Sequence, residues 1–211
     1  MKKTLTLFFF GAMLCAFPGE TEARLDFARL KDFKVKAHVN EQNAEPPPGT
    51  SVRQTEDGIE LNYVFPTAKH DALMIEFPMN VPDADAVTVE LTAAQPGHRP
   101  YLVVVDAGEE FHYLSLIPDE LISHQVIRKT GRQILTAPLP LKTRHPGEVY
   151  ASHWGGDGNQ RIDFPLKRMY IGLNDYPDSF QGKGKIILHS IQFTKGKREN
   201  SFHGDSVQRG F

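Results

Sequence analysis

The sequence contains only one cysteine and one tryptophan among its 211 residues. The cysteine, Cys15, lies in an apolar segment near the N-terminus, so no disulfide and no thiolate zinc site can form within the rest of the chain. Leu14 precedes Cys15, where a bacterial lipobox has a small residue, and a lipid anchor is therefore not expected. The hydrophobic core alone must stabilise the fold, which a chain of roughly 190 residues can do.

Charge bias, long apolar runs and familiar catalytic motifs are also missing. The 24 basic and 26 acidic residues give a net charge of −2, which predicts neither nucleic-acid binding nor attraction to an anionic membrane. No apolar run is long enough to span a bilayer. The sequence has no His-Glu-x-x-His, Gly-x-Ser-x-Gly, P-loop or dinucleotide-binding motif.

The first 23 residues have the pattern of a signal peptide. Lys2 and Lys3 precede the short apolar stretch Leu5–Phe17. Thr21-Glu22-Ala23 then provides small residues at positions −3 and −1 of a cleavage site. We therefore expect cleavage after Ala23 and export to the periplasm or the extracellular space.

Most of the remaining chain alternates between apolar and polar residues with the period of a β-strand. Turn residues recur about every ten positions, and no long amphipathic helix is present. We predict an all-β fold, an antiparallel β-sandwich or jelly roll, over residues 55–195. Residues 24–54 are expected to form an N-terminal segment with an edge strand at 33–37 and a proline-rich loop, and 196–211 a disordered tail.

The stretch His153–Leu166 holds the single tryptophan, Trp154, followed by two glycines and a polar turn. Exposed, Trp154 would offer a flat apolar face on which a sugar ring stacks, with His153 and Asp157 beside it to bind hydroxyl groups. Buried, it would fill the core beneath the glycine turn, which is the common fate of a tryptophan in a sandwich.

The oxygen-bearing side chains of Asp157, Asn159 and Asp163 surround Gly158 in the same stretch. Calcium takes several oxygen ligands from a tight turn, so these three residues are a candidate structural calcium site. A solvated Asx-type turn explains the same composition.

A hairpin is predicted at Asp106–Glu109, with Glu110 and His112 on one face of the returning strand. Paired carboxylates in a cleft can hydrolyse glycosides, but these residues follow a turn and one strand face. We interpret them as a solvated hairpin tip whose polar face could line a ligand groove through His112.

The loop Asn174–Asp178 contains one aromatic residue, Tyr176, directly after a predicted strand. If this loop meets the Trp154 stretch, Tyr176 is a second stacking ring. Otherwise it belongs to an ordinary polar loop.

Four segments in this order resemble those of a known fold family. They are Leu61–Phe65, Val105–Tyr113, His153–Leu166 and Gly182–Ile191. Together they resemble the galactose-binding-like jelly-roll domains that are appended to bacterial secreted glycoside hydrolases. Gly131-Arg132 departs from the pattern, since related domains often have Gly-Trp before this strand.

The resemblance implies a non-catalytic, carbohydrate-binding domain whose partner is a polysaccharide or glycan. A glycoside hydrolase on a separate chain is a further expected partner, because the motifs of a catalytic domain are missing here. Two alternatives stay open. Related jelly rolls also act as assembly factors, which would make this protein a periplasmic or cell-surface scaffold, and a small glycan-active enzyme is the third hypothesis.

Overall fold

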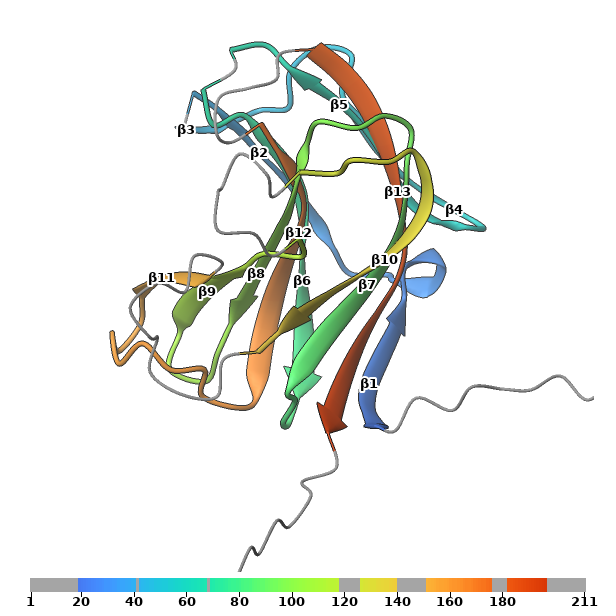
Figure 1. Ribbon diagram of the computed structural model, residues 1–211. Helices are drawn as coiled ribbons and strands as arrows, with labels where there is room; N and C mark the ends of the chain where they lie inside the picture. Colours follow the sequence, from blue (N-terminus) through green and yellow to red (C-terminus); the bar gives the residue numbers. More distant parts are fainter. Residues whose placement is uncertain are drawn as a thin grey trace, which may run out of the picture.

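The computed structural model describes residues 19–40, 42–67, 69–117, 126–139, 151–175 and 182–196, and these form an almost entirely β structure (Figure 1). Within them lie thirteen strands and one short 3-10 helix, η1. Their bounds are β1 Gly19–Asp26, η1 Phe27–Arg29, β2 Lys34–Val39, β3 Gln42–Ala44, β4 Ser51–Thr55, β5 Gly58–Phe65, β6 Ala72–Val81, β7 Ala86–Ala93, β8 Arg99–Val105, β9 Glu110–Leu114, β10 Gly131–Pro138, β11 Ala151–Gly155, β12 Leu166–Asn174 and β13 Gly182–Gly196.

The strands form two antiparallel sheets that face each other (Figure 1). One has six strands in the order β10-β7-β13-β5-β4, with β1 also paired to β13. The other has seven strands in the order β11-β9-β8-β12-β6-β2-β3. Neighbours in space are rarely neighbours in sequence, as in a jelly roll. The predicted antiparallel β-sandwich is confirmed.

The core lies between the two sheets and follows the alternation of the strands. On β8, Leu102 and Val104 are buried in the core, whereas Tyr101 and Val103 point to the outer face of the seven-stranded sheet. The central strand β12 contributes Met169 to the core in the same way. A strand with this pattern has one side for packing and one side free for a ligand.

The sandwich extends further toward the N-terminus than the predicted boundary at residue 55. Strands β1 and β4 belong to the six-stranded sheet, and β2 and β3 to the seven-stranded sheet. The expected edge strand at 33–37 is β2, but it pairs with both β6 and β3 and is therefore not at the edge. The polar residues around it gave no sign of the short strand β3 that covers it.

Strand β1 contains Ala23, after which we predicted cleavage, and pairs with β13 on both sides of that position. The cleavage site stays a prediction. Residues 1–18, with Cys15, and the predicted tail beyond Gly196 lie outside the described residues. No helix in the described part of the chain is long and apolar enough to cross a membrane.

Candidate functional site

Trp154 lies on β11, at the edge of the seven-stranded sheet, and its side chain faces outward. Its cross-strand partner on β9 is Phe111. The two rings stack with centroids 5.4 Å apart and an angle of 13° between their planes. Trp154 is 44% exposed, so the interpretation of this residue as a core plug is wrong. An exposed indole backed by a second ring is a rigid apolar platform.

The platform forms one end of a groove on the outer face of the seven-stranded sheet. Every strand of this sheet contributes at least one residue to the groove, which has a volume of about 320 Å³. Its lining residues are Lys36, His38, Asn43, Met74, Tyr101, Val103, Phe111, Trp154 and Tyr170. The groove therefore crosses the strands, which at the usual spacing extend over about 29 Å when flat.

Aromatic residues continue from the platform toward the middle of the sheet. Phe111 lies with its ring centroid 6.1 Å from that of Tyr170, and Tyr101 lies on the strand between them. The Arg168 guanidinium lies 5.7 Å from the centroid of the Phe111 ring. One half of the groove is therefore apolar and aromatic.

Charged groups in and beside the groove are paired with one another. Glu76 lies between Lys36, at 3.5 Å, and Arg168, at 3.6 Å. Arg168 also donates a hydrogen bond of 2.7 Å to Glu109, which in turn contacts Lys167 at 3.1 Å. These contacts leave the groove without a free charge of either sign among the residues they join.

His38 and Tyr101 provide neutral hydrogen-bonding groups in the groove. Burial lowers the pKa of His38 below its usual value, and Lys36 lowers it further although a hydrogen bond with Asn43 opposes the shift. Burial raises the pKa of Tyr101 to about 12. Both side chains are therefore uncharged at neutral pH and suited to hydroxyl groups.

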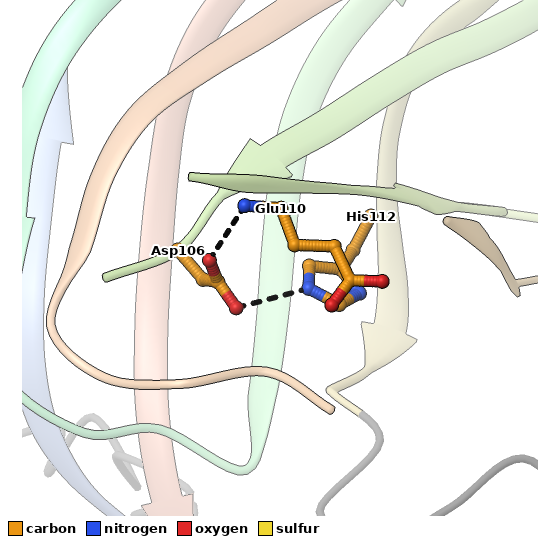
Figure 2. A group of neighbouring side chains, drawn as sticks. All are labelled: Asp106, Glu110 and His112. Atoms are coloured by element: carbon orange, nitrogen blue, oxygen red, sulfur yellow. Dashed lines mark hydrogen bonds and ion pairs between the residues drawn. The ribbon is translucent and has the colours of Figure 1, made fainter. Parts of the chain in front are cut away.

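On the inner face of the sheet, behind the platform, a polar cluster is formed by Asp106, Glu110 and His112 (Figure 2). The Asp106 carboxylate accepts the Glu110 backbone N–H at 2.9 Å and lies 3.2 Å from His112 Nε2. The side chains of Asp106 and Glu110 are fully buried and that of His112 nearly so. The interpretation of these residues as a solvated hairpin tip is wrong, and His112 does not line the groove.

His153 joins this cluster from β11. Its cross-strand partner is His112, just as Phe111 is that of Trp154. His153 Nδ1 lies 3.0 Å from Glu110 Oε1, and its side chain is mostly buried. His153 therefore supports the platform from behind and does not lie beside Trp154 on the outer face.

The loop after β11 folds over the cluster. Glu110 accepts the backbone N–H of Gln160 at 3.1 Å, and Asp106 accepts that of Asp163 at 3.0 Å. Because the loop chain passes very close to the β8–β9 hairpin, only a glycine fits at position 156, where φ is +55° and a Cβ would lie 2.3 Å from the Glu110 nitrogen.

The three candidate calcium ligands do converge in this exposed loop. Asn159 Nδ2 donates to Asp157 Oδ2 at 2.8 Å and to Asp163 Oδ2 at 2.9 Å. The amide nitrogen thus lies between the two carboxylates, and the Asn159 backbone N–H bonds to Asp157 Oδ1 as in an Asx-type turn. A calcium ion would require the amide oxygen in that place, and the calcium site stays a prediction.

The other sequence-predicted residues are dispersed. Asp157 lies in the loop and is absent from the groove lining. Tyr176 lies outside the described residues. Phe111, Tyr101 and Tyr170 were not predicted as site residues, although each is an aromatic on the outward-facing position of an interior strand. That recurring position was the signal available in the sequence.

No protein-family model and no curated protein sequence matches this chain significantly. Solved structures do. The family 11 carbohydrate-binding module from Clostridium thermocellum, in complex with a β-1,3-1,4-mixed-linked tetrasaccharide, is similar with a TM-score of 0.51 and 13% identity, over 86% of this chain and 98% of the module.

Two further structures of such modules agree. The module of the cellulosomal cellulase Lic26A-Cel5E of Clostridium thermocellum matches with a TM-score of 0.50 and 10% identity, over 87% of this chain and 99% of the module. The solution structure of CtCBM11 matches with a TM-score of 0.51 and 9% identity, over the same shares of both chains. This chain thus has the jelly-roll fold of these carbohydrate-binding modules.

Proposed function

We propose that this protein binds a neutral, linear polysaccharide in the groove of the seven-stranded sheet, without catalysing a reaction. The observation that carries the proposal is the exposed Trp154 ring, stacked on Phe111 at the end of an aromatic row. Pyranose rings present apolar C–H faces to aromatic rings, and their hydroxyl groups need neutral donors and acceptors such as those of His38 and Asn43.

The pairing of charges supports a neutral ligand. Lys36 lines the groove and Arg168 lies beside Phe111, and both contact Glu76. An anionic glycan would have to compete with Glu76 for Lys36 and Arg168, and its own charges would have to lose their water. A neutral chain requires no such exchange.

The course of the groove across the sheet supports a chain of several sugar residues as the ligand. A groove lined by residues from all seven strands can contact several consecutive sugar residues of one chain. The related module in complex with a β-1,3-1,4-mixed-linked tetrasaccharide makes mixed-linkage β-glucan the first ligand to test.

The two other hypotheses have less support. A scaffold needs a contiguous apolar patch, but the large exposed hydrophobic residues in the described part of the chain are Val35, Ile134 and Trp154, on three separate strands. An enzyme needs converging titratable groups in contact with substrate. Asp106 and Glu110 converge, but both are fully buried beneath the loop at 156–163.

Export and a partner enzyme complete the proposal. The signal-peptide pattern in residues 1–23 would deliver the protein to the compartment where polysaccharides are degraded. There it would act beside a separate glycoside hydrolase and hold the substrate close to it.

The test is isothermal titration of the purified chain with soluble polysaccharides: mixed-linkage β-glucan, xylan, mannan, and the anionic polygalacturonate. We expect saturable binding to at least one neutral chain and none to polygalacturonate. The proposal fails if no glycan binds, or if only the anionic one does.

A further inference from the structure

We propose that Asp106, Glu110, His112 and His153 form a binding site for one divalent transition-metal ion of the zinc class. The inference is independent of the proposed carbohydrate binding. Asp106 follows β8, Glu110 and His112 lie on β9, and His153 lies on β11. One ligand atom from each of the first three lies within 4.8 Å of the others, and this is the group with metal-ligand spacing among the described residues.

The burial of two carboxylates here calls for a compensating positive charge. Asp106 and Glu110 are both 0% exposed. A buried carboxylate without a balancing charge costs several kcal/mol. Among the described ion pairs, these two carboxylates contact only imidazoles and no lysine or arginine. A bound divalent cation would balance both carboxylates together.

One atom in the cluster points to a missing ligand. Glu110 Oε1 is buried and accepts no hydrogen bond within the described part of the structure. His153 Nδ1 nevertheless lies 3.0 Å from it. Two polar atoms this close without a hydrogen bond are placed as two ligands of the same ion would be.

Two distances in the cluster are slightly shorter than the ligand spacing of a tetrahedral zinc site and would reach it with a small outward shift of the side chains. Zinc binds imidazole nitrogens and carboxylate oxygens at roughly 2.0–2.2 Å, so neighbouring ligands of a tetrahedron lie about 3.3–3.6 Å apart. Glu110 Oε1 and His153 Nδ1 are 3.0 Å apart, and Asp106 Oδ2 and His112 Nε2 are 3.2 Å apart. Two imidazoles with two carboxylates favour zinc-class ions over calcium, which prefers oxygen ligands alone.

The surroundings hold these ligands in place. Backbone N–H groups of Glu110, Gln160 and Asp163 bond to the two carboxylates, as outer-shell donors do around metal ligands. His112 and His153 are cross-strand partners directly behind Phe111 and Trp154. A metal at this point would join β9, β11 and the covering loop.

The test uses the full chain without a histidine tag, because the imidazoles of a tag would bind the metal in addition to the nine histidines of the sequence. After treatment with a chelator, the protein is titrated with Zn²⁺ by calorimetry and with Co²⁺ by visible absorption. We expect one ion per chain and the intense d–d bands of tetrahedral cobalt. Glu110→Gln and His112→Gln should each weaken zinc binding by more than about 100-fold, because loss of an outer partner alone costs ~10–100-fold.

The matched control is Glu109→Gln, which changes the exposed carboxylate next to Glu110 and should leave zinc binding unchanged. If circular dichroism shows that the buried variants do not fold, His153→Gln decides, because His153 is partly exposed and its substitution should weaken binding at least ~10-fold. The proposal is overturned if the wild-type chain binds no zinc, or if these substitutions leave binding intact. The cluster is then a hydrogen-bonded network only.

Discussion

Trp154 and Phe111 lie opposite each other on β11 and β9, and the residues beside them, His153 and His112, are also cross-strand partners. Because side chains alternate along a strand, this one pairing builds two features back to back. The aromatic pair is on the outer face, in the groove, and the histidine pair is on the inner face, in the polar cluster. The register of β9 and β11 therefore places the candidate ligand site directly in front of the polar cluster that supports it.

Replacement of Trp154 by alanine should remove most of the carbohydrate affinity and little stability. The indole is an exposed anchor in the groove, and loss of such an anchor costs about 2 kcal/mol of binding free energy, or about 30-fold in Kd. Calorimetric titration with the best glycan measures the change. Ile134→Ala, an exposed apolar residue on the other sheet, is the control and should bind as the wild type does. Equal affinity of the two variants would contradict the assignment of the groove.

Carbohydrate binding should be nearly independent of salt. The basic groups at the groove are paired with Glu76 and Glu109, so a neutral glycan gains no net Coulomb attraction. Between about 50 mM and about 500 mM NaCl, where screening changes strongly, we expect Kd to change by less than about 2-fold. A tenfold loss of affinity over this range, measured by the same titration, would indicate an anionic ligand instead.

Stability should fall between pH 6.5 and pH 4 in a way that depends on His98. This side chain is fully buried beside Tyr63 and Phe65, and burial lowers the pKa of His98 from 6.5 to about 4. As the pH falls, the unfolded chain takes up the proton before the folded chain does. The contribution of His98 to the free energy of unfolding is therefore complete above pH 6.5 and is lost as the pH falls to about 4. The shift corresponds to about 3 kcal/mol.

Urea unfolding of the wild type and of His98→Gln, at several pH values in this window, measures that contribution. The variant also loses ring contacts, so its free energy of unfolding should be lower at every pH. The informative quantity is the slope of the free energy of unfolding against pH, which should be smaller for the variant. Parallel pH profiles would show that His98 is not the titrating group.

Two glycines of the covering loop should differ sharply in their tolerance of alanine. Gly158 has φ of +68° and open space around it, so Gly158→Ala should cost about 1 kcal/mol from the backbone conformation alone. Gly156 also has positive φ, and a Cβ there would meet the backbone of Glu109 and Glu110. Gly156→Ala should therefore cost about 3 kcal/mol. If urea unfolding showed that the two variants lose similar amounts of unfolding free energy, the loop would not be held against the hairpin.

The sequence predicted the sandwich because alternation and turn spacing are local properties. Strands β5 to β12 lie within the predicted range of 55–195, and β13 ends one residue beyond it. Strand β3 has only three residues, and β11 runs directly into a glycine-rich loop. Both carry too little alternation to be recognised in the sequence. Their positions depend on pairing with β2 and β9.

The site was only partly predictable for a similar reason. Trp154 drew attention as the single tryptophan, and its exposure followed from the register of β11 with β9. Asp106 and Glu110 were expected in solvent because they flank a turn. The loop that buries them is more than 45 residues away in sequence, and no local pattern indicates that it folds back.

The most direct test of the central claim uses the fluorescence of Trp154, the only indole in the chain. Without ligand, the exposed ring should emit at long wavelength and be quenched readily by acrylamide. Saturation with mixed-linkage β-glucan, or with whichever neutral glycan binds in the titration panel, should shift the emission to shorter wavelength and protect the ring from quenching. A glycan that binds tightly while the emission and the quenching of Trp154 stay unchanged would contradict the claim that this groove is the binding site.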